Sequence, residues 1–171
     1  MSVSRCIVSA MSNPYAKFLG SRDPMKVIAG TPAELAALLT GLSVAQLNCA
    51  PAPGKWSITE ILAHLADCEL VFGVRLRQTL AEPHHVIQPF DQELWAKQYG
   101  SYGAYESLET FTGARRWNVQ LLDGVNKDDW QKPVTHPERG TMNFRTIVET
   151  MAGHDRNHLA QIEKLAGKMP A

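Results

Sequence analysis

The clearest pattern along the chain is a run of apolar residues spaced as on one face of an α-helix. Ser57, followed three residues later by Glu60, forms the capping-box pattern that begins many helices. Beyond it the stripe consists of Ile58, Ile61, Leu62, Leu65, Phe72, Leu76 and Leu80. Because proline does not continue a helix, we expect one long amphipathic helix that ends before Pro83.

A similar start signal stands earlier in the chain, in the segment GTPAEL. Thr31 is placed as an N-cap, Pro32 as the first helical residue and Glu34 as the third, again a capping box. The pattern predicts a helix over residues 31–41, followed by a short helical turn at residues 43–47.

Helical spacing predicts two more helices, at residues 104–124 and 143–167. Residues 83–103, rich in Pro, Gly and aromatic residues, predict a long crossover loop with a short helix near 92–98. Residues 125–142 predict a second irregular connection, and no segment alternates as a strand would. The expected fold is therefore all-α, a four-helix bundle with a long crossover.

The length of 171 residues fits one domain with a sizeable core. We expect residues 25–171 to form the bundle and residues 1–24 to be an N-terminal extension that is partly disordered. A second stretch that resembles the start of a protein follows at Met11. The alternative is therefore that translation starts at Met11 and that the first ten residues are not part of the protein.

Composition argues against several classes of partner. The 17 basic and 17 acidic residues cancel and form no basic run, which disfavours nucleic acid and acidic membranes. No apolar run approaches the roughly 18 residues of a membrane span. Cys6, Cys49 and Cys68 form no CxxC pair, as in a cytoplasmic protein with reduced thiols, and Cys68 is expected to be a small buried residue.

Two candidate metal ligands, His154 and His158, lie four residues apart on the inward face of the last helix. A buried imidazole needs hydrogen-bond partners or a metal. His64 stands at the edge of the apolar stripe of the 57–80 helix and supplies a third nitrogen. Three neutral nitrogens suit a divalent transition metal and leave coordination positions open. The alternative is that these are ordinary core or surface histidines.

The remaining histidines, His84, His85 and His136, fall in predicted loops, where solvated or lid residues are the simpler interpretation. His84 and His85 could still approach the site if the crossover loop covers one end of the bundle. Asp67, one turn from His64, is placed to orient a ligating imidazole.

Charged residues also fall on inward faces. Glu69 lies in the apolar stripe of the 57–80 helix, and Asp155 lies beside the two histidines of the last helix. Because buried charges pair, we expect an ion-pair network of these two carboxylates with one of Arg75, Arg115 or Arg116. A purely structural role for this network is the simpler expectation.

Two segments, KWSITEILAHLADCE (55–69) and GHDRNHLAQIEKL (153–165), resemble the DinB/YfiT-like superfamily, which includes the bacillithiol and mycothiol S-transferases. The resemblance extends from about residue 31 to residue 165. In that family the histidine of the first segment and the two of the HxxxH motif hold a metal ion. Carried over, these are His64, His154 and His158, the residues that helical placement also selects.

The resemblance implies an up-down-down-up bundle, a site with zinc or nickel, and often a homodimer. The leading hypothesis is a metal-dependent enzyme that activates a low-molecular-weight thiol, or water, for attack on a small electrophilic substrate entering past residues 83–103. One alternative is a non-catalytic metal-binding or stress-response bundle with a closed four-ligand shell, completed by His85 or Asp67. Another is a metal-dependent hydrolase.

Overall fold

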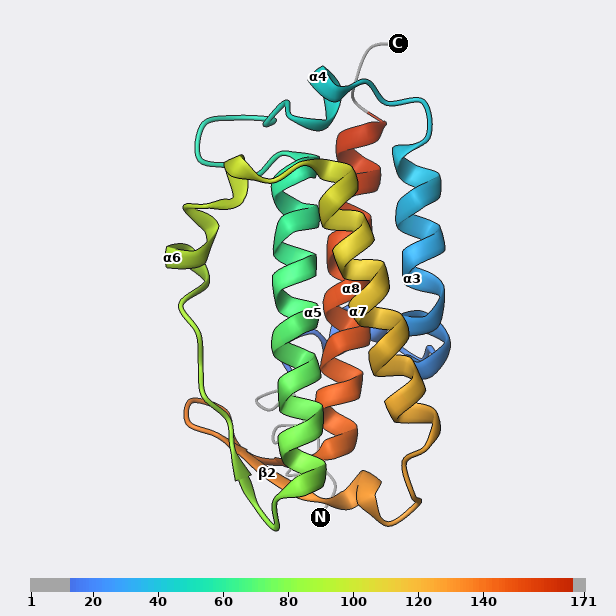
Figure 1. The fold of residues 1–171 in the computed structure, drawn as a ribbon, viewed down its shortest axis with the longest axis vertical. Coiled ribbons are helices and arrows are strands. Elements are labelled where there is room, and N and C mark those ends of the chain that lie inside the picture. The colour runs from blue at the N-terminus through green and yellow to red at the C-terminus, as the bar shows by residue number, and fades with distance from the viewer. Residues whose placement is uncertain (1–12, 168–171) are drawn as a thin grey trace.

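Four long helices make up most of the computed structural model, which describes residues 13–167 (Figure 1). They are α3 (Pro24–Leu39), α5 (Ile58–Ala81), α7 (Ala104–Asp123) and α8 (Phe144–Ala166). In Figure 1, α3 and α8 run upward and α5 and α7 run downward. This confirms the four-helix bundle and the up-down-down-up order.

Three of the four helices begin where the sequence predicts. Ser57 caps α5, its hydroxyl accepting a hydrogen bond from the Glu60 N–H while the Glu60 carboxylate accepts one from the Ser57 N–H. The Asn143 side chain caps α8 in the same way, accepting from the Thr146 N–H at 3.0 Å. Helix α7 begins at Ala104, as expected.

The predicted start of the first helix is wrong. Helix α3 begins seven residues before Thr31, at Pro24, where the Asp23 side chain accepts from the Met25 N–H. Thr31 and Pro32 lie inside the helix. Pro32 has no N–H to bond the carbonyl of Ile28, the residue four positions earlier. A side chain of α7 takes that carbonyl instead, so the proline is accommodated by a tertiary contact.

The expectation of no strand is also wrong. The shorter elements are α2 (Ala16–Leu19), α4 (Val44–Leu47), β1 (His85–Val86), α6 (Gln92–Ala96), η1 (Tyr99–Ser101), η2 (Asp129–Gln131), β2 (Pro133–His136) and β3 (Gly140–Asn143). The strands pair in the order β1-β2-β3, β1 parallel to β2 and β2 antiparallel to β3. Strands of two to four residues are too short to show alternation, and β1 depends on a partner about 50 residues away.

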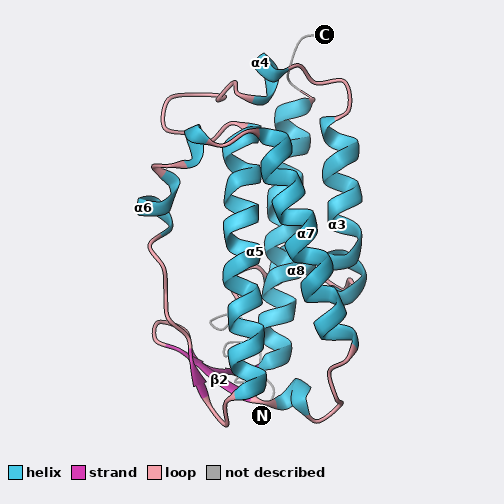
Figure 2. Cartoon of the chain, in the orientation of Figure 1, coloured by secondary structure: helices cyan, strands magenta, loops and turns pink. Residues whose placement is uncertain are grey.

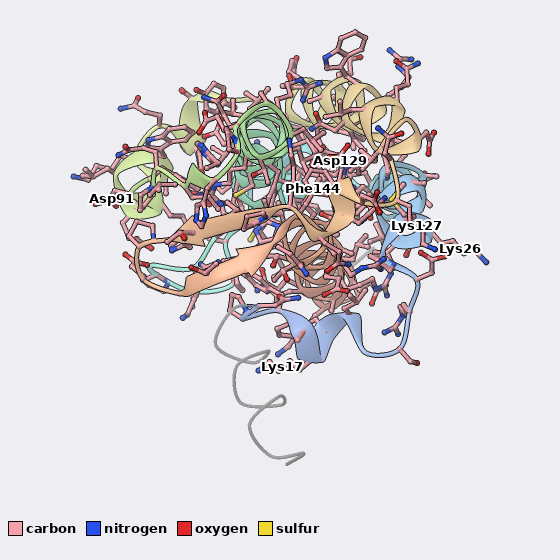
Figure 3. All side chains as sticks on the ribbon, turned by 90° about the horizontal axis from the view of Figure 1, so that it is seen from below. Lys17, Lys26, Asp91, Lys127, Asp129 and Phe144 are labelled. Atoms are coloured by element: carbon pink, nitrogen blue, oxygen red, sulfur yellow. The ribbon has the colours of Figure 1, made fainter. Side chains whose placement is uncertain are left out.

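This small sheet lies across one end of the bundle, with its strands in magenta in Figure 2. Figure 3 looks at that end directly and shows the β2–β3 hairpin crossing beside the helix ends. The turn of the hairpin, residues 137–139, brings Arg139 to a cavity that side chains of α5 and α8 also line.

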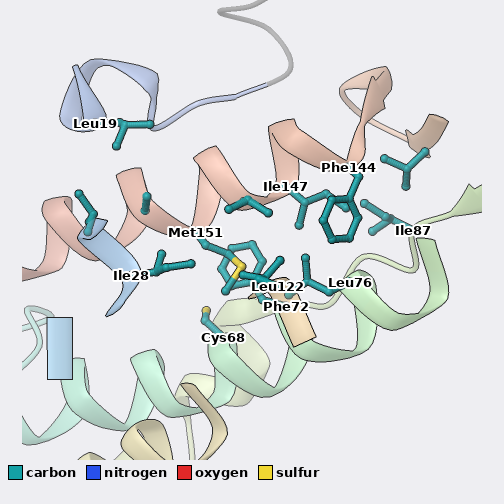
Figure 4. Packing of buried hydrophobic residues seen from close by; sticks show 14 residues of the cluster. Leu19, Ile28, Cys68, Phe72, Leu76, Ile87, Leu122, Phe144, Ile147 and Met151 are labelled. Carbon is teal, nitrogen blue, oxygen red and sulfur yellow. The ribbon is translucent and has the colours of Figure 1, made fainter. Parts of the chain in front are cut away.

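A belt of buried polar residues divides the core in two. One apolar cluster, drawn in Figure 4, lies on the sheet side and includes Phe72 and Met151. The other, toward α4, includes Leu65 and Leu159. Between them all four long helices contribute buried polar side chains: Thr31, His64, Glu69, Arg115, Asn118, His154, Asp155 and His158.

The N-terminal segment packs against the bundle from residue 13 onward. Leu19 of α2 belongs to the sheet-side cluster, and α2 lies against α8. Gly153 of α8 makes this approach possible, because a Cβ there would lie 2.5 Å from the carbonyl oxygen of Tyr15. The disorder expected at the start of the chain falls largely on residues 1–12, outside the described residues. The boundary at residue 25 stays a prediction.

Within residues 13–167, no helix is both long and apolar enough to cross a bilayer.

Candidate metal centre

Three histidines from two helices converge in the polar belt. His64 of α5 and His154 and His158 of α8 are each at most 5% exposed. The Nε2 atoms of His64 and His154 are 3.0 Å apart, and one nitrogen from each of the three rings lies within 4.8 Å of the others. The structure thus brings together the three residues selected from the sequence, although their role as ligands stays a prediction.

Hydrogen bonds on the far side of the rings orient two of the three imidazoles. The Nδ1 of His158 lies 3.0 Å from the Gln161 Oε1, an acceptor, so Nδ1 carries the hydrogen and Nε2 keeps its lone pair. The Nδ1 of His64 lies 3.5 Å from the Tyr99 hydroxyl. Both contacts leave Nε2 free to face the cluster, which is how ligating histidines are held.

Asp67 acts through Tyr99 rather than on His64 directly. Its carboxylate accepts a hydrogen bond from the Tyr99 hydroxyl, whose oxygen faces the His64 Nδ1. Tyr99 belongs to η1, at the end of the crossover loop, and is fully buried. Nothing in the sequence pattern singles it out, because an isolated aromatic residue in a loop carries no spacing signal.

Aromatic rings enclose the cluster and limit its contact with water. The ring of Trp56 lies 4.9 Å from that of His64, centroid to centroid. Tyr15 meets His154 edge-on at 5.1 Å, and Phe72 meets it at 5.9 Å. Tyr15 comes from the N-terminal segment, so the packing of α2 on α8 also closes one side of the site.

Burial keeps these imidazoles neutral. Loss of hydration, followed by the nearby charge of His158, lowers the pKa of His64 to about 3. Burial lowers the pKa of His158 to about 4 and that of His154 well below its usual range. At pH 7 the site therefore offers three unprotonated nitrogens, the form that binds a metal. The donor set fits a divalent transition metal.

Beside the histidines lies the network predicted among inward charges, with Arg115 as its cation. The guanidinium donates to Glu69 at 2.7 Å, to Asp155 at 2.6 and 3.1 Å, and to the Ile28 carbonyl left free by Pro32 at 2.8 Å. Burial alone would lower the pKa of Arg115, but the two carboxylates raise it. Arg116 is exposed, and Arg75 is not part of the network.

Two further side chains complete the hydrogen bonding of the carboxylates. The Thr31 hydroxyl donates to Asp155 Oδ2 at 2.9 Å, and the Asn118 amide donates to Glu69 Oε1 at 2.7 Å. Two carboxylates from α5 and α8 share one guanidinium from α7, so the network ties three of the long helices together beside the histidines.

The loop histidines lie outside the cluster. His85 pairs with Glu82 at 2.8 Å, and His84 Nε2 lies 2.8 Å from the Thr135 hydroxyl. Within residues 13–167, the group of side chains close enough together to hold a metal ion contains neither His85 nor Asp67. Neither residue is therefore a fourth ligand of a closed shell. Cys68 Sγ is 3.5 Å from His64 Nε2, but burial raises the pKa of this thiol, which stays protonated.

Two cavities flank the centre. A cavity of about 70 Å³ contacts His154 itself and is bounded by Tyr15, Phe72 and Phe90. A larger one of about 470 Å³ lies on the opposite side. Its lining includes Trp56 and Gln161, which touch His64 and His158, but none of the three histidines. The smaller cavity is therefore the direct approach to the cluster.

Comparison with known proteins agrees with the family resemblance seen in the sequence. The model of the DinB superfamily matches residues 28–162. A protein named "putative metal-dependent hydrolase" from Oceanobacillus iheyensis is 29% identical over 127 residues, which cover 70% of each chain. One of the same name from Bacillus cereus (strain 03BB102) is 27% identical over 139 residues, covering 81% of this chain and 80% of the relative.

A solved structure shares the fold. YfiT from Bacillus subtilis, described as a probable metal-dependent hydrolase with an unusual four-helix bundle topology, superimposes with a TM-score of 0.79. The alignment covers 94% of this chain and 98% of YfiT at 20% identity. At that identity, the likeness establishes the architecture.

Proposed function

The chain belongs to the DinB superfamily, and from that premise we propose that it is a metal-dependent hydrolase acting on a small molecule. The observation that carries this proposal is the convergence of three buried, neutral imidazoles, from His64, His154 and His158. The two relatives carry the name "putative metal-dependent hydrolase", which favours water over a thiol as the nucleophile.

The ion proposed for the three nitrogens is zinc or nickel. Such an ion supplies Lewis-acid chemistry, lowering the pKa of water at an open position toward neutrality. The chain's own residues do the rest. Gln161 and the Tyr99–Asp67 pair fix two of the rings, and the rings of Trp56 and Phe72 keep bulk water away. Glu69 and Asp155, both tied to Arg115, link α5, α7 and α8 beside the cluster and so hold the histidine-bearing helices in place.

Activation of a low-molecular-weight thiol is the second candidate. It uses the same three histidines, and the cavity at His154 favours it, because the aromatic walls of this cavity accept the apolar stem of a small thiol. The two candidates differ in whether substrate consumption requires added thiol.

The test begins with metal content per chain, measured by elemental analysis on protein made without a His-tag. About one zinc or nickel per wild-type chain is expected, with nearly all of it lost in His64→Gln and in His158→Gln. His84→Gln is the matched control, because His84 is an exposed histidine outside the cluster. Stoichiometric metal in His158→Gln would refute the ligand assignment.

The reaction is then assayed with small esters, amides and halogenated electrophiles, with and without added thiol. Turnover that needs the metal but no thiol supports the hydrolase. Turnover that needs both supports the thiol transferase. A metal-loaded protein without turnover on any of these classes leaves the non-catalytic bundle as the better interpretation.

A further inference from the structure

Two arginines face the small cavity beside His154. Arg75 comes from α5, one turn beyond Val71, and Arg139 comes from the turn between β2 and β3. Their residues are separated by 64 positions in the chain, so only the packing of the hairpin across the bundle end brings them together (Figure 3). Both are half-buried.

Neither arginine has a carboxylate partner among residues 13–167. The ion pairs of the described chain involve Glu82, Glu69, Asp155 and Glu34, and all of these bind other residues. The Arg75 Nε is buried without any hydrogen-bond partner. Burial and then the positive charge of Arg139 lower the pKa of Arg75, as expected where two like charges approach each other.

The arrangement holds Arg75 in place without neutralising it. Its guanidinium lies 5.9 Å from the ring centroids of both Phe72 and Phe90, within cation–π range. A further space of about 10 Å³ continues from the cavity and is lined by Arg75, Arg139 and His136. The His136 Nδ1 accepts a hydrogen bond from the Glu138 N–H, so in the neutral ring Nε2 is a donor.

Two guanidiniums that approach each other without a counter-charge repel each other, and an anion between them would relieve this repulsion. Guanidinium groups match oxyanions by paired N–H donors. We propose that the cavity beside His154 binds the oxyanionic group of the substrate, a carboxylate or a phosphate, through Arg75 and Arg139.

This inference rests on the proposed function, because it identifies the substrate of the proposed metal centre as an anionic small molecule. The cavity contacts both His154 and the two arginines. A substrate anchored by its anionic end therefore extends its reactive group toward the three-histidine cluster. The walls formed by Phe72, Phe90 and Tyr15 favour a short apolar or aromatic spacer between the two ends.

The test uses the full chain after removal of metal by chelation, so that anions cannot bind through an ion. Sodium acetate and inorganic phosphate are titrated separately by calorimetry at pH 7 in a buffer free of carboxylates. One saturable site per chain is expected, with a dissociation constant on the order of millimolar for ligands this small. Arg139→Gln and Arg75→Gln should each weaken binding at least tenfold, whereas Arg116→Gln, an exposed arginine of α7, should not change it.

The outcomes separate the possibilities. Binding of acetate alone identifies a carboxylate substrate, and binding of phosphate alone identifies a phosphorylated one. No saturable binding of either anion to the wild type overturns the inference, as does equal binding by Arg139→Gln. Arg139 lies in a surface turn, so this variant tests the idea even if Arg75→Gln fails to fold.

Metal content, measured on each preparation before the chelation step, distinguishes the two proposals. If the chain binds metal but no anion, the proposed hydrolase function stands and the proposed anion site is refuted. If it binds the anion through both arginines but never binds metal, the anion site stands and the hydrolase function is refuted.

Discussion

At His64, His154 and His158, the burial that prepares the nitrogens for a metal also makes the metal-free chain sensitive to acid. In the unfolded chain these rings take up a proton near pH 6.5, whereas in the folded chain His158 does so only near pH 4 and His64 near pH 3. Below pH 6.5 the unfolded state therefore binds more protons than the folded state.

We predict that the free energy of unfolding of the chelated protein is constant between about pH 7 and 8, below the range in which the thiol of Cys68 ionises in the unfolded chain, and falls as the pH drops from 6.5 toward 4. Each ring that stays neutral contributes a loss of about 1.4 kcal/mol per pH unit. Urea titrations at pH 7, 6 and 5 measure the slope. His158→Gln should reduce this slope by the contribution of one ring, about 1.4 kcal/mol per pH unit. An unchanged slope would contradict the assignment of His158 as a buried neutral ring.

A second prediction at this scale concerns Arg115. Arg115→Met leaves Glu69 and Asp155 buried without their cation and removes the partner of the Ile28 carbonyl. We expect a loss of about 3–5 kcal/mol in urea unfolding. Its neighbour Arg116 is exposed, so Arg116→Met should change stability by less than about 0.5 kcal/mol. Similar losses in the two variants would show that the network contributes little.

The site residues differ in how far the sequence could reveal them. His64, His154 and His158 stand on long amphipathic helices, where a period of 3.6 residues fixes which way each side chain points. Arg115, Glu69 and Asp155 follow from the same rule. Tyr99 and Arg139 stand in a loop and a turn, where no period applies and tertiary contacts alone decide their positions.

At the scale of elements, the errors share a physical cause. Thr31 and Pro32 look like a helix start because local chemistry favours one, but the fold supplies both with distant partners, Asp155 for the hydroxyl and Arg115 for the carbonyl that Pro32 leaves free. The strands escape prediction for the same reason, since β1 exists only by pairing with β2.

The docking of the N-terminal segment on α8 yields a prediction that compares two helical glycines. Gly153→Ala would place a Cβ 2.5 Å from the Tyr15 carbonyl oxygen, so the segment must shift, and we expect a loss of about 1–3 kcal/mol. At Gly113 of α7, a Cβ would meet no atom within 4 Å beyond its chain neighbours and the nearby backbone of its own helix, so Gly113→Ala should stabilise by about 0.5–1 kcal/mol. Thermal unfolding of both variants measures the difference.

If Gly153→Ala were as stable as the wild type, the close packing of Tyr15 on α8 would not contribute to the folded state. Because Tyr15 also covers His154, the same variant should expose the cluster to solvent. Faster loss of bound metal to a chelator than in Gly113→Ala would report that exposure.

At the scale of the whole molecule, the long crossover follows from topology. Helices α5 and α7 pack side by side and run in the same direction, so the chain must return along the bundle after the 24 residues of α5, a distance of about 36 Å. The connection between them, residues 82–103, has the length that this return requires. The homodimer that the family resemblance implies stays a prediction. The exposed side chains of Leu70, Val74 and Trp117 on these two helices mark the face on which to look for it.

The division of the site between helices and a hairpin bears on how such a protein can evolve. The three histidines stand on rigid helices in the core, where a change of register would disrupt the fold. Arg139 stands in a three-residue turn. Insertions and deletions are tolerated best in turns of this kind. A change of length there would move one arginine relative to the histidines, so selection could alter the proposed anion site without disturbing the proposed metal site.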